Sequence, residues 1–364
     1  MSAGPERAPW VRDGTGPGMV NAHTHLYSAL ASFGMPEPTP PPRDFREILR
    51  AVWWRLDRAL DERTLVAGAR LYAAEALLAG TTTLVDHHES PGMIEGSLDL
   101  LAEACVAIGI RAVLCYGATE RNGGREEAEA GLGECRRFIH ANRRPLVRGV
   151  VGLHASFTVS DETVREAGRL CAELGTVMHV HVAEDRCDLE DARARGHAGP
   201  LERLFDLEAL PPGSILAHGV WLDREQVASC ERAGVWLVHN PRSNRHNRVG
   251  EARALDASRR VALGTDGFPA DLETEWAALP PDPPRAASRA LAGHALVAER
   301  FAPASLDGDQ VTRLESRVER VTVGGVTVVE AGRLVNADLE ELRAHAREIA
   351  PELWRRVERL SWPD

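Results

Sequence analysis

The stretch Thr176-Val177-Met178-His179-Val180-His181-Val182-Ala183-Glu184 carries the pattern that decides the fold. An apolar run rich in β-branched residues is typical of a buried strand, and this one ends in polar residues. The same pattern recurs at regular intervals, and together the stretches predict about eight buried strands in series. The others cover residues 18–25, 81–88, 110–119, 146–156, 214–220, 235–240 and 259–266.

Amphipathic segments rich in Ala, Leu, Glu and Arg lie between these strands and predict helices. They cover residues 44–60, 63–79, 94–108, 125–141, 161–174 and 223–233. Gly80, Gly109, Gly175 and Gly234 each stand where a helix should end. Strands that alternate with helices in this number predict an α/β fold, a (β/α)₈ barrel of the TIM type. A doubly wound open sheet is the structural alternative.

The domain organisation follows from where this alternation begins and stops. Residues 1–17 predict an irregular leader, and residues 18–312 the barrel. Residues 280–284 are rich in proline and precede a helix expected at 285–301. The last segment, residues 313–364, predicts a β-hairpin that turns at Gly324 and Gly325, followed by a charged helix at 338–360.

Composition excludes several classes of protein. The formal net charge of −11 argues against a nucleic-acid partner, and the sequence has no apolar run long enough to span a membrane. Six scattered cysteines without a C-x-x-C pair predict reduced thiols and a cytoplasmic protein. The chain has no lysine, so a Schiff base and a carbamylated lysine that bridges two metal ions are excluded.

Histidines and acids gather at the predicted strand ends. In a barrel these ends face one mouth, so residues far apart in the sequence converge there. Imidazole and carboxylate ligands without thiolate predict one divalent ion, zinc or iron(II), with an open position for water. Either His179 or His181 could be the ligand from its strand. The candidates are His23, His25, His179, His181, Glu184, His218 and Asp266.

Other polar residues at strand ends are candidates for substrate binding. His154 and Asn240 are expected to line the substrate pocket. His87 and His88 also end a predicted strand. For these two, packing within the barrel and a functional role both remain open.

Several motifs resemble those of the amidohydrolase superfamily. Residues 19–26 resemble its opening motif, and residues 179–185, 217–219, 239–244 and 264–267 resemble its cytosine deaminase and triazine hydrolase branch. The resemblance implies His23, His25, His181 and Asp266 as metal ligands, so His181 rather than His179. It also implies that Glu184 carries a proton, that His218 orients the water, that Asp266 doubles as the base, and that His154 contacts the substrate.

Members of this superfamily have a small β-sandwich domain and a long segment after the final aspartate. The resemblance therefore implies that this chain keeps a truncated remnant of the sandwich. With a shorter tail, we expect residues 272–301 and 338–360 to cover the seam between the first and last barrel strands.

The expected function is hydrolysis of a carbon–nitrogen bond by a metal-activated water. The substrate is expected to be a small polar heterocycle, and the reaction its deamination. One alternative is an amide- or chloride-releasing hydrolase that uses the same site. Another is a metal-binding homologue without catalytic activity. No nucleic acid or membrane is expected as a partner, and a homodimer is compatible with this interpretation.

Overall fold

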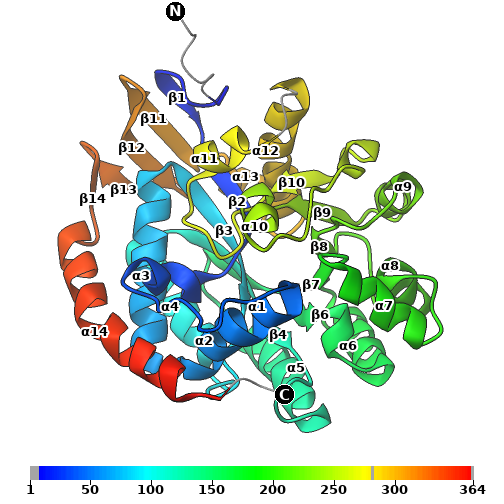
Figure 1. Ribbon diagram of the computed structural model, residues 1–364. Helices are drawn as coiled ribbons and strands as arrows, with labels where there is room; N and C mark the ends of the chain where they lie inside the picture. Colours follow the sequence, from blue (N-terminus) through cyan, green and yellow to red (C-terminus); the bar gives the residue numbers. More distant parts are fainter. Residues whose placement is uncertain (1–7, 280–282, 362–364) are drawn as a thin grey trace, which may run out of the picture.

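Eight parallel strands form a barrel that is surrounded by helices (Figure 1). The computed structural model describes residues 8–279 and 283–361. The strands follow the order β2-β3-β4-β6-β7-β8-β9-β10, and the short β5 pairs with β4. This arrangement confirms the predicted TIM-type barrel. The strands are β2 (Met19–Thr24), β3 (Thr81–His88), β4 (Arg111–Ala118), β5 (Val147–Gly149), β6 (Val151–Ala155), β7 (Met178–Val182), β8 (Ile215–His218), β9 (Trp236–His239) and β10 (Val261–Leu263).

The helices agree with the predicted alternation, with additions in the loops. The segment expected as one helix at 44–60 divides into α1, a π-helical turn and α2. α7, α8, α10, α11 and α13 were not predicted, because helices of four to nine residues are too short for a helical period to stand out. The helices are α1 (Phe45–Ile48), α2 (Trp54–Ala59), α3 (Glu62–Leu78), α4 (Ser97–Ile108), α5 (Arg125–Ala141), α6 (Asp161–Leu174), α7 (Arg186–Ala194), α8 (Pro200–Asp206), α9 (Arg224–Arg232), α10 (Pro241–His246), α11 (Leu272–Ala277), α12 (Pro283–Ala298), α13 (Pro303–Leu306) and α14 (Leu339–Arg359).

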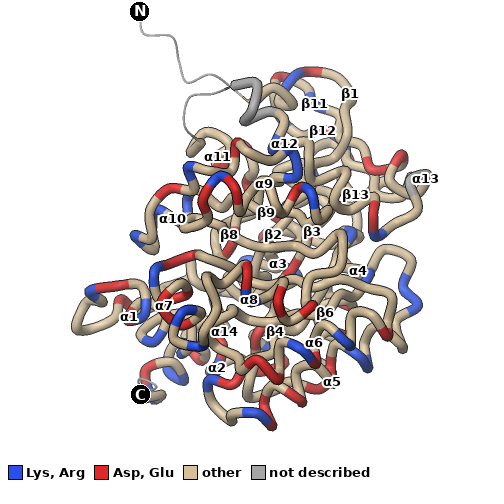
Figure 2. The backbone as a smooth tube through the Cα atoms, turned by 90° about the vertical axis from the view of Figure 1, so that its right-hand side faces the viewer, with Lys and Arg blue, Asp and Glu red and all other residues tan. Residues whose placement is uncertain are grey.

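The apolar core lies mainly between the strands and the outer helices. In one part, β3 and β4 pack against α3, α4 and α14. In another, the strands β6, β7, β8 and β9 pack against α6, α8 and α9. Outside the core, arginines and acidic residues alternate along the helices (Figure 2). Many of them pair, as Arg137 does with Asp99 at 2.6 Å and with Glu134 at 2.7 Å. None of the helices in the described part of the chain combines the length and the apolar character that a membrane span requires.

The barrel closes through a short seam between β2 and β10. Thr24 and Asp266 form a parallel bridge, and the amide of Asp266 donates to the carbonyl of His23 at 3.0 Å. The side chain of Asn21 extends the seam, because its Oδ1 accepts from the amide of Thr265 at 3.0 Å. At Gly264 a Cβ atom would lie 2.8 Å from the carbonyl oxygen of His23, so only glycine allows this approach.

The cover of the seam differs in part from expectation. α12 packs against both β2 and β10, as predicted for the segment 272–301. A Cβ atom at Gly293 would lie 2.8 Å from Cβ of Val20, so the helix lies very close to β2. The expectation for residues 338–360 is wrong, because α14 packs on α3 and α2 instead. Its apolar face, which includes Leu353 and Trp354, is buried against those helices.

A small antiparallel sheet stands beside the barrel, with the order β1-β11-β12-β13-β14. The predicted hairpin is confirmed as β12 and β13, but the sheet also includes three strands that the sequence did not predict. The prediction of an irregular leader is wrong for residues 14–17, which form β1 and pair with β11. Residues 1–7 of that leader lie outside the described residues. The expected boundary at residue 312 falls within β11. The strands are β1 (Gly14–Pro17), β11 (Gln310–Leu314), β12 (Arg317–Val323), β13 (Val326–Glu330) and β14 (Arg333–Leu334).

Candidate metal centre

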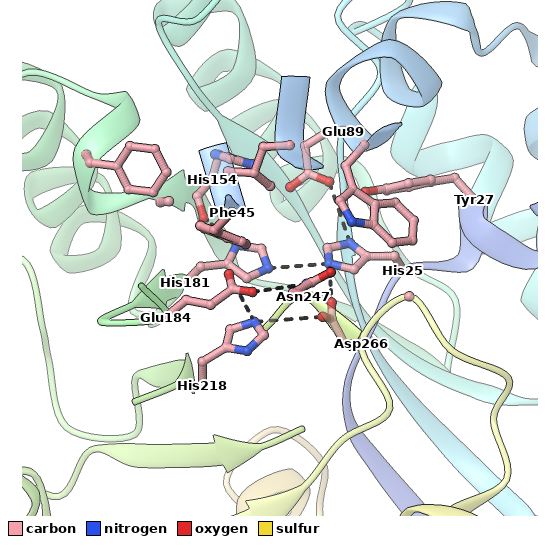
Figure 3. A pocket seen from close by; sticks show the side chains of 15 residues that line it. His25, Tyr27, Phe45, Glu89, His154, His181, Glu184, His218, Asn247 and Asp266 are labelled. Atoms are coloured by element: carbon pink, nitrogen blue, oxygen red, sulfur yellow. Dashed lines mark hydrogen bonds and ion pairs between the residues drawn. The ribbon is translucent and has the colours of Figure 1, made fainter. Parts of the chain in front are cut away.

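Five predicted residues converge at the C-terminal mouth of the barrel. Figure 3 labels four of them, His25, His181, His218 and Asp266. One ligand atom each from His23, His181, His218 and Asp266 lies within 4.8 Å of the others. His25 completes the group, because its Nε2 lies 2.9 Å from Asp266 Oδ1 and 3.3 Å from His181 Nε2. The parallel strands bring these side chains together from residues up to 243 positions apart, between His23 and Asp266 (266 − 23).

The protein holds these imidazoles by their outer nitrogens. Nδ1 of His25 donates to the carbonyl of His87, and Nδ1 of His181 donates to the carbonyl of His154. Both Nε2 atoms therefore face the centre, where each can offer a lone pair to an ion once it carries no proton. Such outer partners set the tautomer and orientation of a metal-binding histidine.

The donor set fits a divalent cation. Two Nε2 lone pairs that face each other at 3.3 Å repel unless a proton or a cation lies between them. Nε2 of His23, which is fully buried, has no hydrogen-bond partner among the described residues. A metal ion would satisfy all of these atoms together, and imidazole with carboxylate suits zinc or iron.

Electrostatics at the centre favour neutral imidazoles at His23 and His181 and an ionised Asp266, whereas His25 tends to hold a proton. Burial lowers the pKa of His23 to about 3 and that of His181 well below its usual range. Burial also lowers the pKa of His25, but the hydrogen bond to Asp266 and the charge of Glu89 outweigh it and raise the pKa to about 9. A proton and a metal ion therefore compete for Nε2 of His25.

His179 lies behind the centre rather than in it. Its Nε2 lies 3.0 Å from Nδ1 of His23, so it holds His23 as the carbonyl oxygens hold the other imidazoles. Its Nδ1 lies 3.7 Å from Sγ of Cys115. Spacing alone left His179 and His181 open as candidates; in the structure His181 lines the mouth of the barrel and His179 does not.

Three strand ends at the centre have left-handed backbone conformations. The φ angles are 51° at Ala183, 77° at His218 and 53° at Asp266. Residues with side chains adopt this region at a cost, and such strain is common at functional sites. At Ala183 the amide donates to the buried carboxyl of Asp188, which holds the turn that presents Glu184.

A polar network lies opposite His25 and joins Glu184 to Asp266. Asn247 Nδ2 donates to Glu184 Oε1 at 3.3 Å and to Ser243 Oγ at 3.3 Å, and Ser243 donates to Asp266 Oδ2. Burial raises the pKa of Glu184 to about 7, and the charge of Asp266 acts in the same direction. The carboxyl of Glu184 can therefore exchange a proton near neutral pH. Asn247 was missed by the sequence analysis, because a polar loop does not reveal which side chain turns inward.

A pocket opens beside the centre and has one apolar wall. The wall comes from the segment between β2 and α3, of which residues 44–60 were expected as helix, and from the loop after β6. His154 lines the pocket as predicted, whereas Asn240 is buried behind His218, with Nδ2 3.5 Å from His218 Nδ1. The wall residues are Tyr27, Phe45, Leu49, Trp53 and Phe157, and polar lining residues include His25, Glu89, His154, His181, Glu184, His218, Asn247 and Asp266.

His87 and His88 are both fully buried at the end of β3. His87 Nδ1 lies 2.6 Å from Glu89 Oε1, and His88 Nε2 lies 2.8 Å from Ser90 Oγ. Neither histidine lines the pocket. His87 contributes its carbonyl to His25, so it supports the centre through the backbone.

The barrel with a histidine and aspartate centre at its mouth defines the class to which this protein belongs. The model of the Amidohydrolase family matches residues 16–324, and the chain belongs to this family. The predicted resemblance to the superfamily is confirmed.

Particular relatives within this class are deaminases. The chain is 32% identical over 256 residues to 5'-deoxyadenosine deaminase of Methanopyrus kandleri, which covers 69% of this chain and 56% of the relative. It is 32% identical over 272 residues to the 5-methylthioadenosine/S-adenosylhomocysteine deaminase of Thermococcus kodakarensis. This match covers 72% of this chain and 61% of the relative. The match thus spans less than two thirds of either relative.

Solved structures share the fold. A zinc-bound adenosine deaminase of Xanthomonas campestris superposes with a TM-score of 0.77 at 23% identity, covering 95% of this chain and 86% of that one. The atrazine chlorohydrolase of Arthrobacter aurescens, complexed with zinc, superposes with a TM-score of 0.73 at 22% identity, covering 93% and 88%.

Proposed function

We propose that this protein is a metal-dependent hydrolase that removes the amino group of a heterocyclic substrate. The observation that carries the proposal is the position of Glu184. Its carboxyl lines the pocket and lies 3.6 Å from His218 Nε2, on the far side of the centre from His25. A proton carrier beside a metal centre is the arrangement that hydrolysis of a carbon–nitrogen bond requires.

His23, His25, His181 and Asp266 would hold one divalent ion, which we propose to be zinc or iron(II). Such an ion supplies Lewis acidity and lowers the pKa of water at the site towards neutrality. The chain contains no lysine, so a carbamylated lysine cannot bridge a second ion.

The remaining roles fall to side chains that face the pocket. Asp266 would take a proton from the attacking water, and Glu184 would deliver one to the nitrogen that leaves. His218 Nδ1 is held by Asn244 Oδ1 at 2.9 Å, which leaves Nε2 free to donate to oxygen at the reacting carbon if both nitrogens are protonated. His154 would contact the substrate, and Asn240 would support His218 rather than touch the substrate.

The substrate class follows from the relatives and the pocket. The two deaminases that are 32% identical to this chain are named for adenosine-type nucleosides. A flat ring fits against the aromatic wall formed by Phe45 and Trp53. We propose a small amino-substituted heterocycle, free or in a nucleoside. The six free, buried cysteines support a cytoplasmic location, and assembly as a homodimer is part of the same proposal.

The test is ammonia release from a panel of amino-purines, amino-pyrimidines and their nucleosides, with zinc- or iron-loaded protein. We expect turnover of at least one member and none by Asp266→Ala. Chloride or amine release from triazines without ammonia release from the panel would favour the alternative hydrolase. One bound ion per chain without any turnover would favour a homologue without catalytic activity.

A further inference from the structure

Glu89 is a buried carboxyl group in the pocket wall that the proposed mechanism does not use. It follows β3 and is 2% exposed. Its Oε2 lies 3.6 Å from His25 Nδ1, whereas His25 Nε2 lies 2.9 Å from Asp266. Glu89 therefore lies across one imidazole ring from the centre (Figure 3).

One oxygen of Glu89 is held firmly. Oε1 lies 2.6 Å from His87 Nδ1, and His87 Nε2 lies 3.0 Å from the carbonyl oxygen of Leu153. A carbonyl only accepts, so Nε2 carries a proton, and a further proton lies between Nδ1 and Oε1. A Cβ atom at Gly117 would lie 2.5 Å from Oε1, so the pair rests directly on the backbone of β4.

The other oxygen has no hydrogen-bond partner among the described residues. Whether the shared proton sits on His87 or on Oε1, Oε2 remains an acceptor. The nearby Nδ1 of His25 donates to the carbonyl of His87 instead. A buried acceptor without a donor is unfavourable, and a bound molecule with a suitable donor would remove that cost.

We propose that Glu89 determines specificity by accepting a hydrogen bond from a second N–H group on the substrate ring, distinct from the amine that leaves. The inference rests on the proposed function, because it assigns the substrate class of the same pocket. Glu89 lies one imidazole ring from the centre, so its donor belongs on the reacting heterocycle or directly attached to it. A sugar hydroxyl further along the molecule is the other source of such a donor.

The first test uses wild-type protein and pairs of compounds. Adenosine and 2-aminoadenosine differ only by a second amino group, and adenosine and 2',3'-dideoxyadenosine differ only in the sugar. We expect kcat/KM, or the affinity where a compound is bound without turnover, to be at least about tenfold higher with the second amino group. Equal kcat/KM or affinity for adenosine and 2-aminoadenosine would overturn the inference. So would a loss of kcat/KM or affinity that appears only with 2',3'-dideoxyadenosine.

The second test is Glu89→Gln. His87 uses the proton on its Nε2 for the carbonyl of Leu153, so Nδ1 of the neutral ring accepts from the amide NH₂ of the new side chain. The pocket then faces an uncharged amide oxygen, which is a weaker acceptor than the carboxylate. We expect the ratio of kcat/KM for 2-aminoadenosine to that for adenosine to fall towards one in Glu89→Gln, while one ion stays bound to each chain. A ratio equal to that of the wild type would overturn the inference. Glu134→Gln is the matched control, because Glu134 is equally buried, 2% exposed, but pairs with Arg137 outside the pocket.

The outcomes separate this inference from its rivals. His25, His87 and Glu89 together could also hold an ion. Two ions in the wild type and one in Glu89→Gln would make Glu89 a metal ligand and overturn the inference. Loss of the single ion in Glu89→Gln would make it a positioning residue for His25, with the same consequence. If no amino-heterocycle is bound or turned over, the proposed function fails and the inference fails with it.

Discussion

Single residues at the centre divide into those that face it and those that hold them. Nε2 of His25 and of His181 faces inward, while each Nδ1 is held by a backbone carbonyl. Glu184 stands apart, because its contacts are to Asn247 and His218 rather than to the proposed ligands. Substitution can therefore separate metal binding from proton transfer.

We predict that Glu184→Gln keeps the metal and loses turnover by about 10²–10⁴-fold, because the amide has nearly the same shape but carries no proton. Asp266→Ala should lose both metal and turnover. Elemental analysis and ammonia release measure the two properties. Glu162→Gln, on the exposed side of α6, is the control and should behave as wild type. Loss of metal from Glu184→Gln would show that this carboxylate is a ligand.

We predict that Asp188→Asn flattens the pH dependence of stability. Burial raises the pKa of Asp188 to about 7, whereas an exposed aspartate titrates near about 3.9. Between these pH values the folded protein binds a proton that the unfolded chain does not. The free energy of unfolding therefore falls as pH rises from about 4 to about 7.

Urea unfolding between pH 4.5 and 7, in a chelator, measures this slope. It should decrease rather than vanish, because burial also raises the pKa of Asp57 and of Asp86 to about 7. Asp44→Asn, at the exposed N-cap of α1, should leave the slope unchanged. An equal slope in Asp188→Asn would show that Asp188 is ionised in the folded protein throughout.

At the scale of elements, α3 fastens the seam through one side chain. The hydroxyl of Tyr72 donates to the carbonyl of Phe268 at 2.8 Å, and it also bonds Thr24 and Thr265. These residues belong to the two strand ends that carry His23, His25 and Asp266. The seam has few backbone hydrogen bonds. Each side-chain hydrogen bond therefore contributes more to its stability than one between two fully paired strands would.

We predict that Tyr72→Phe lowers the free energy of unfolding by about 1–3 kcal/mol, since it leaves buried hydroxyls unpaired. It should also weaken metal affinity, because the seam positions the ligands. Chemical denaturation and metal titration measure these changes. Tyr116→Phe is the control, since Tyr116 is buried beside His88, away from the seam. Unchanged metal affinity in Tyr72→Phe would show that the ligands are positioned without this hydroxyl.

At the scale of the whole molecule, the metal would hold the barrel shut. Proposed ligands lie on both sides of the seam, and ligand binding to the folded state alone stabilises it by RT ln(1 + [L]/Kd). We predict one divalent ion per chain by elemental analysis and a markedly lower melting temperature after chelation. Amide exchange should rise first in β2 and β10, with β7 as the internal reference.

Protein contacts also hold the seam together, and they could keep the barrel closed without a metal ion. α12 packs on both strands, and Asn21 bonds Thr265 across them. If these contacts suffice alone, apo and holo protein will melt together and β2 will exchange no faster than β7. That result would assign closure of the barrel to the protein alone and leave the metal only its catalytic role.

The sequence alone determined the features that depend on local pattern. The spacing of apolar residues predicted the strands and helices of the barrel. Side chains repeat every two residues in a strand and every 3.6 residues in a helix, so each element can be recognised from its own sequence. Strand ends predicted that His23, His181, His218 and Asp266 would meet, because parallel strands share one mouth. The absence of lysine, read directly from the composition, excluded a lysine-bridged centre.

Tertiary structure decided whatever depends on which distant segments pack together. No local pattern shows that Glu89 lines the pocket with one oxygen unpaired, that Asn247 turns inward, or that Asn240 stays behind His218. For the same reason α14 could be predicted as a helix but not placed on α3, and the four residues of β1 became a strand only by pairing with β11. Hydrogen-bond partners and burial are properties of the assembled chain, whereas periodicity is a property of each segment.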